Sequence, residues 1–172
     1  MKKGFTIIEL FVTMAIISIL SSVVFLNWKS GEAGFALQNS AYRLSQDIRE
    51  MQEMAMEAKE IDCGGGDTGS SFGVQFKKSY VNYYILFVDC NDNHIFGPND
   101  LEIRTVYFEE GVEFSTLSPA AAFTVLFVPP EPTTWISNQT SGTEAVISIY
   151  IPDYSSNQKT IRVNTSGMIE TK

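Results

Sequence analysis

Hydrophobic residues follow three different patterns along this chain, and the first is a long apolar run near the N-terminus. Residues 5–26 are 22 consecutive positions in which Glu9 is the only ionisable side chain. A helix of about 20 apolar residues crosses the hydrocarbon core of a bilayer. The run therefore predicts a transmembrane helix, and Lys2 and Lys3 ahead of it predict an N-terminus on the cytoplasmic side.

The second pattern predicts that the helix continues over residues 27–61. Polar side chains such as Asp47 are predicted to form its outer face. A coiled coil would use the same period, but abundant strand signals follow, so the pattern favours a helix packed on a sheet. The apolar side chains recur at spacings of four and three residues, at Leu37, Ala41, Leu44, Ile48, Met51, Ala55 and Ala58.

The third pattern, over residues 62–172, consists of alternating residues and short apolar runs that are typical of strands. A Pro-rich segment after Val128 is predicted to open a long polar loop over residues 131–143. The fold class is therefore α+β, with a long N-terminal helix, half in the membrane, packed on antiparallel β-sheet. The predicted strands are 72–76, 83–88, 102–108, 112–116, 123–128, 145–151, 160–164 and 167–171, the last two forming a hairpin.

Glu9 requires a partner if the first run lies in a membrane. A charged carboxylate at that depth costs roughly 2.5–3.5 kcal/mol on insertion scales. Residues 5–26 contain no Lys, Arg or His that could neutralise it. The simplest available cation is an α-amino group, which a cut in the chain nearby would produce.

The residues Met1-Lys2-Lys3-Gly4 followed by Phe5-Thr6-Ile7-Ile8-Glu9-Leu10 resemble the prepilin signal of type IV pilins and type II secretion pseudopilins. The resemblance implies that a membrane aspartyl prepilin peptidase removes residues 1–4 as a leader, cutting between Gly4 and Phe5. It also implies that Phe5 is N-methylated and that Glu9 pairs with the free amine of a neighbouring subunit during filament assembly. An ordinary signal anchor with a chance Glu is the alternative. A secretory signal peptide fits worse, because the apolar run is too long.

The order of elements resembles the H-type minor pseudopilins and related minor pilins, the GspH/FimT-like branch. This resemblance implies a structural minor subunit of a type II secretion pseudopilus or a type IV pilus. Its partners would be other pilins or pseudopilins, contacted through the N-terminal helix. The chain would be a single-pass protein of the inner membrane, with residues 62–172 in the periplasm or outside the cell.

Two cysteines are predicted to form a disulfide. If strands 72–76 and 83–88 pair as a hairpin, Cys63 and Cys90 come to the same edge of the sheet. A domain outside the cytoplasm is in an environment where disulfides persist. Two free buried thiols are the alternative. A zinc site has little support, because His94 is the only histidine that could join them.

A calcium loop is the one candidate metal site. Asp89, Asn91, Asn93 and Asp100 match positions one, three, five and twelve of such a loop in ligand type. His94 replaces the usual glycine at position six, and no helices are expected on either side. A polar turn is the alternative, because Asp and Asn favour tight turns for local reasons. Calcium is the only cofactor that the sequence suggests.

Charge and composition exclude several classes of function. The net charge is −8, and removal of Lys2 and Lys3 would make the side-chain charge −10, which argues against nucleic acid as the main partner. A single histidine and the lack of a phosphate-binding glycine motif argue against an enzyme. Two alternatives to a structural subunit remain. One is a binding module displayed by a filament, such as an adhesin or a DNA-uptake minor pilin, and the other is an anchored domain that never assembles.

Overall fold

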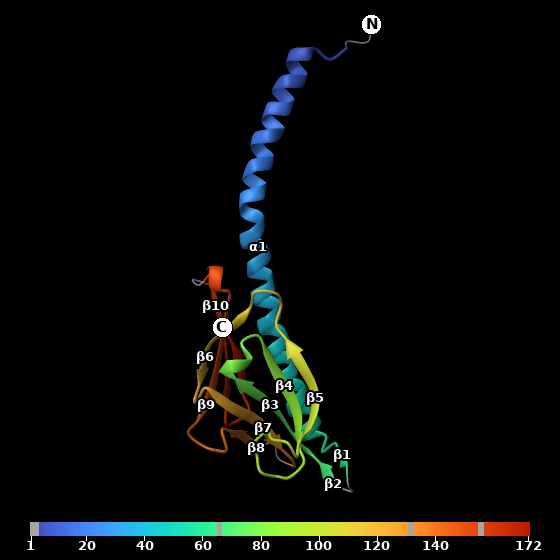
Figure 1. The fold of residues 1–172 in the computed structure, drawn as a ribbon, viewed down its shortest axis with the longest axis vertical. Coiled ribbons are helices and arrows are strands. Elements are labelled where there is room, and N and C mark those ends of the chain that lie inside the picture. Colours follow the sequence, from blue (N-terminus) through green and yellow to red (C-terminus); the bar gives the residue numbers. More distant parts are fainter. Residues whose placement is uncertain (1–3, 65–66, 131–132, 155–156) are drawn as a thin grey trace.

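The computed structural model has one long helix and two main antiparallel sheets, which confirms the predicted α+β class. It describes residues 4–64, 67–130, 133–154 and 157–172, without the side chains of residues 23–30, 67 and 154. Helix α1 (Ile7–Met56) projects from the domain along its N-terminal half and packs against the sheets along its C-terminal half (Figure 1). Of the predicted segments, residues 1–3 of the leader, 65–66 of the glycine run and 131–132 of the loop lie outside the described part.

The larger sheet has five strands in the order β5-β4-β3-β7-β8. The hairpin predicted from strands 72–76 and 83–88 is confirmed, because β3 and β4 pair antiparallel with Ser71 opposite Asp89. The 3₁₀-helix η1 (Lys78–Tyr80) connects these two strands. The five strands are β3 (Ser71–Lys77), β4 (Tyr83–Asp89), β5 (Leu101–Tyr107), β7 (Ala122–Val128) and β8 (Thr133–Ile136).

The smaller sheet has four strands in the order β11-β10-β9-β6. Its last two strands form the predicted C-terminal hairpin, with Arg162 opposite Glu170. The 3₁₀-helix η2 (Pro152–Tyr154) lies between β9 and β10. The strands are β6 (Glu113–Ser118), β9 (Glu144–Tyr150), β10 (Gln158–Asn164) and β11 (Ile169–Thr171).

Three strands were missed by the sequence analysis. The short strands β1 (Ile61–Gly64) and β2 (Asp67–Gly69) pair as a separate ribbon ahead of the first predicted strand. Strand β8 lies within the predicted loop 131–143, so that prediction was wrong. Backbone hydrogen bonding to β7 holds these residues as an edge strand, a position in which a neighbouring proline is tolerated.

Helix α1 ends at Met56, five residues before the predicted end at Ile61. Ala58 adopts the left-handed conformation, with a φ of 47°. The N–H of Lys59 donates to the carbonyl of Met54 over 3.2 Å, which closes the last turn in a Schellman arrangement. The prediction that Ala58 belongs to the apolar stripe was therefore wrong, and Ile61 begins β1.

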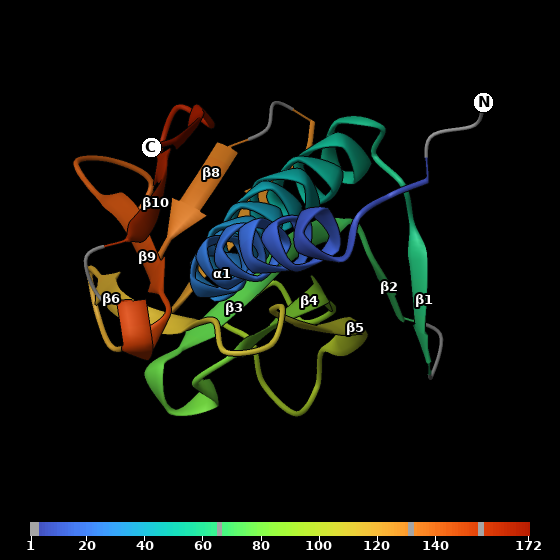
Figure 2. The same ribbon diagram turned by 90° about the horizontal axis from the view of Figure 1, so that it is seen from above.

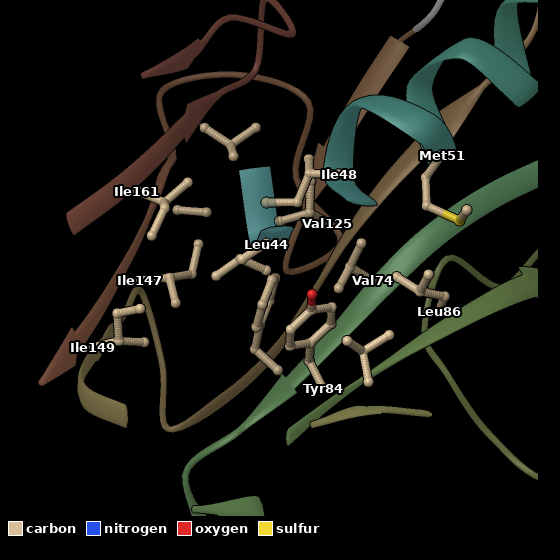
Figure 3. Close-up of a cluster of buried hydrophobic side chains, with 14 of the residues drawn as sticks. Leu44, Ile48, Met51, Val74, Tyr84, Leu86, Val125, Ile147, Ile149 and Ile161 are labelled. Carbon is tan, nitrogen blue, oxygen red and sulfur yellow. The ribbon is translucent and has the colours of Figure 1, made fainter. Parts of the chain in front are cut away.

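The core lies between α1 and the two sheets, as Figure 2 shows from above and Figure 3 shows in detail. The apolar stripe of the helix faces this core, which confirms packing on a sheet over a coiled coil. Side chains of both sheets meet the stripe, among them Val74 and Val125 from the larger sheet and Ile147 and Ile161 from the smaller one. The stripe residues are almost fully buried: Leu37, Ala41, Leu44, Ile48, Met51 and Ala55.

A buried carboxylate fixes the helix against the larger sheet. Asp47 is only 6% exposed, so its predicted place on the polar outer face was wrong. Its two oxygens accept hydrogen bonds from the Tyr84 hydroxyl, at 2.5 Å, and from the Arg104 guanidinium, at 3.0 Å. Arg104 also pairs with Glu50 at 3.1 Å. Burial raises the pKa of Tyr84, and the hydrogen bond to Asp47 raises it further.

We expect Tyr84→Phe to lower the free energy of unfolding by about 1–3 kcal/mol at neutral pH, because Asp47 loses a buried donor. The variant should also change the response to alkali. In the unfolded wild-type chain, Tyr84 ionises near its ordinary pKa of 10.0. In the folded protein the same group keeps its proton at that pH. Its contribution to stability is therefore complete below that pH and is lost as the pH rises above it. Urea titrations across this range would measure both effects.

Tyr107→Phe is the matched control, since Tyr107 is 59% exposed. It should have the wild-type free energy of unfolding at neutral pH. It should also keep the loss of stability at alkaline pH that Tyr84 causes. Equal stability of the two variants at every pH would contradict the assigned role of the Asp47 cluster.

Candidate functional site

The predicted cleavage site lies in an extended, exposed segment ahead of α1. Gly4, Phe5 and Thr6 precede the first helical residue, and Phe5 is 78% exposed. A Cβ built on Gly4 would meet nothing within 4 Å. No contact in the described chain therefore requires a glycine at this position, and the backbone on both sides of the predicted cut is accessible.

Glu9 has a partner within its own chain that the sequence analysis missed. Thr6 is the N-cap of α1, and its hydroxyl accepts a hydrogen bond from the Glu9 N–H at 3.4 Å. The Glu9 carboxylate in turn accepts from the N–H and the hydroxyl of Thr6, at 3.5 and 3.4 Å. This capping box has a recognisable signal, a Thr followed by a Glu three positions later.

The position and geometry of Glu9 leave it available to a second partner. The hydrogen bonds that its carboxylate accepts, at 3.5 and 3.4 Å, are longer than the normal range, so each is weak. The carboxylate lies in the first turn of the helix, where the helix dipole favours negative charge. An open hollow of about 340 Å³ beside it is lined by Thr6, Ile8, Glu9, Val12 and Thr13.

The N-terminal part of α1 exposes apolar side chains around its whole circumference. Within the described residues, no helix combines the length and the hydropathy that crossing a membrane requires. An apolar surface of this extent is nevertheless characteristic of an interaction site. The large side chains exposed by half or more are Phe5, Ile7, Ile8, Leu10, Phe11, Val12, Met14, Ile16, Ile17, Ile19 and Leu20.

The predicted disulfide is confirmed. Cys63 in β1 bonds to Cys90, directly after β4, with a Cα–Cα distance of 5.9 Å and a sequence separation of 27. On the chain-entropy account, closing a loop of this length stabilises the fold by about 3 kcal/mol. Gly69 allows β2 to lie close to the end of β4, because a Cβ there would lie 2.4 Å from a methyl group of Val88.

The loop between β4 and β5 uses its acidic residues for local hydrogen bonds. Asp89 is fully buried and accepts from the N–H groups of Asn91, Asn93 and His94, at 3.3, 3.3 and 2.8 Å. Asp100 accepts from the N–H groups of Gly97 and Cys90, and burial raises its pKa despite these bonds.

The side-chain oxygens of the two asparagines are engaged in the same way. Asn91 accepts from the N–H of Asn93 at 3.1 Å, and Asn93 accepts from the N–H of Ile95 at 2.8 Å. No group of three or more His, Cys, Asp or Glu side chains in the described part of the chain could hold a metal ion. The arrangement favours the polar-turn alternative, and calcium binding stays a prediction.

Comparison with known families supports the prepilin reading of the N-terminus. Residues 1–25 match the prokaryotic N-terminal methylation motif, a type IV pilin-like prepilin signal. No curated protein and no solved structure matches the chain. The match covers 25 of the 172 residues, so it identifies the N-terminal signal and does not extend to the rest of the chain. It gives no support to the GspH/FimT-like branch. The helix packed on antiparallel sheets is consistent with the pilin-like fold.

If the loop is a polar turn, Asp89→Asn should lower the free energy of unfolding by about 1–3 kcal/mol, because the new amide group cannot accept from all three N–H groups. Asp92→Asn is the matched control, since Asp92 is exposed and Asn tolerates its φ of 53°. Thermal unfolding of both variants, with and without calcium, would measure the difference. A calcium-dependent rise in Tm that Asp89→Asn abolishes would establish the calcium reading instead.

Proposed function

We propose that this protein is a structural minor subunit of an inner-membrane-anchored filament, either a type II secretion pseudopilus or a type IV pilus. The observation that carries the proposal is the arrangement at the N-terminus. An exposed, extended Gly4-Phe5 bond is followed by a helix that is apolar on all sides, with one carboxylate in its first turn. Such a helix suits a core made of many parallel helices.

Processing between Gly4 and Phe5 would supply the cation that Glu9 lacks. The new α-amino group of Phe5 would lie one residue before the helix cap, at the end of an exposed segment. In a filament core of low dielectric, opposite charges attract strongly and unpaired charges are costly. Glu9 of one subunit would neutralise the Phe5 amine of its neighbour and so set the axial register between them. The weak capping bonds to Thr6 leave the carboxylate free to make this change.

Before assembly, the apolar half of the helix would anchor the chain in the inner membrane, with the folded domain in the periplasm. The exposed apolar side chains of α1 support this placement, since water would otherwise cover them. The Cys63–Cys90 disulfide also fits, because disulfides persist in oxidising compartments.

The place of the protein within the filament is inferred from the order of its elements. The assignment as a minor subunit of the GspH/FimT-like branch depends on the order of elements alone. The alternative function is a binding module displayed by the filament, such as an adhesin. An anchored domain that never assembles is the third possibility, and it differs from the first in its tolerance of changes at Glu9.

Glu9→Gln and Glu9→Ala should each reduce incorporation into filaments by about tenfold or more, which corresponds to a loss of about 1.4 kcal/mol per contact. Both should still insert into the membrane, because each removes a charge from the apolar segment. The ratio of sheared filament protein to membrane-bound protein would measure the effect. Thr6→Ser is the control, since it keeps a capping hydroxyl and should assemble normally. Normal incorporation of both Glu9 variants into filaments would show that the carboxylate has a role other than pairing with a neighbouring subunit.

A further inference from the structure

A groove lies between α1 and two loops at the end of the domain from which the helix projects. The loop between β5 and β6 and the short helix η2 form its other walls. Its volume is about 600 Å³, larger than the hollow beside Glu9. Its apolar floor is formed by Ala33, Ala36 and Ile151. Its rim carries four carboxylates, Glu32, Glu109, Glu110 and Asp153, and we call the whole the acidic groove.

The wall of the acidic groove that the loop between β5 and β6 forms is held in place. The N–H of Glu109 donates to the Ser40 hydroxyl on α1 at 3.0 Å, and the N–H of Val112 donates to the Glu109 carbonyl at 3.1 Å. Phe108, directly before the rim, is 8% exposed and packs edge-on against Phe114. On this side a ligand would therefore meet a preformed wall, which reduces the entropy lost on binding.

The shape of the floor suits a helix. Ala33 and Ala36 are small, and a Cβ built on the neighbouring Gly31 or Gly34 would meet nothing within 4 Å. Small residues let a second helix approach closely. The exposed apolar side chains of residues 7–20 lie on the same helix, N-terminal to the groove.

The charge of the rim indicates which kind of ligand the groove would bind. None of its four carboxylates forms an ion pair with another described residue. A cationic ligand would relieve their mutual repulsion, whereas anionic lipid headgroups would add to it. The groove is therefore complementary to a basic partner and not to a membrane surface.

A second copy of this chain does not supply that basic partner. Several cationic side chains of the described domain are already engaged, Arg104, Arg162 and Lys172 in ion pairs and Lys78 with two carbonyl groups. The remaining ones, such as Arg43, Lys59 and Lys159, come from separate elements and form no cluster in sequence. With a net charge of −8, two copies also repel each other.

We propose that the acidic groove binds a cationic amphipathic helix of a different protein subunit. This proposal rests on the proposed function, because it names the kind of neighbour that a minor subunit would have in its filament. Basic side chains of the partner helix pair with the rim, and its apolar side contacts Ala33, Ala36 and Ile151.

The test uses the full chain in discs of uncharged lipid and a fluorescent peptide of about 15–20 residues, an amphipathic helix of Leu, Ala and Lys. The same peptide with Glu in place of Lys is the anionic probe. Fluorescence anisotropy should show binding of the cationic peptide alone. The double variant Glu109→Gln/Glu110→Gln should bind it about tenfold more weakly, which corresponds to about 1.4 kcal/mol. The double variant Glu53→Gln/Glu57→Gln removes the same charge from two exposed positions outside the groove, at the C-terminal end of α1 and at its C-cap, and should bind normally.

Equal loss in both double variants would mean non-specific attraction and would overturn the proposal. Two other results would also overturn it: self-association of the wild-type chain that depends on Glu109 and Glu110, or binding to anionic vesicles with the same dependence. Peptide binding is measured without filament formation. A negative result therefore rejects the groove proposal and leaves Glu9-dependent assembly unaffected.

Discussion

Burial of one face of α1 between two sheets is the constraint on which the rest of the structure depends. Four large side chains of that face, Leu37, Leu44, Ile48 and Met51, are almost completely removed from water. Each contributes about 1.5–3 kcal/mol on burial. The two sheets have few other ways to cover their inner faces, so the helix holds them together. The Asp47 cluster then fixes the helix at one position along the larger sheet.

The pattern of apolar side chains on this helix changes along its length. The buried stripe is confined to one face near the domain, whereas apolar side chains surround the helix near Glu9. The first pattern suits a folded core, and the second suits a lipid or protein environment on every side. One continuous helix of 50 residues connects the two, so in the proposed filament the position of the N-terminus would constrain the position of the domain.

The sequence predicts the features that depend on periodicity and fails where a local contact decides. The stripe from Leu37 to Ala55 and most strands follow from spacing alone, and the disulfide follows from one hairpin. The helix end was missed because Ala58 fills a left-handed position that usually holds glycine. Its place in the helix pattern predicts that Asp47 is a surface residue. Only the folded structure brings Tyr84 and Arg104, which are distant in sequence, into contact with it. The partner of Glu9 was overlooked although Thr6 provides a visible signal for it.

The mass of the N-terminus after co-expression with an active prepilin peptidase tests the central claim most directly. The account predicts a chain that lacks residues 1–4 and begins with a methylated Phe5. Gly4→Val should remain uncut, since the open surroundings of Gly4 mean that only the peptidase requires a small residue there. An unchanged mass for the natural sequence, beside a control prepilin that the same peptidase cuts, would contradict the account.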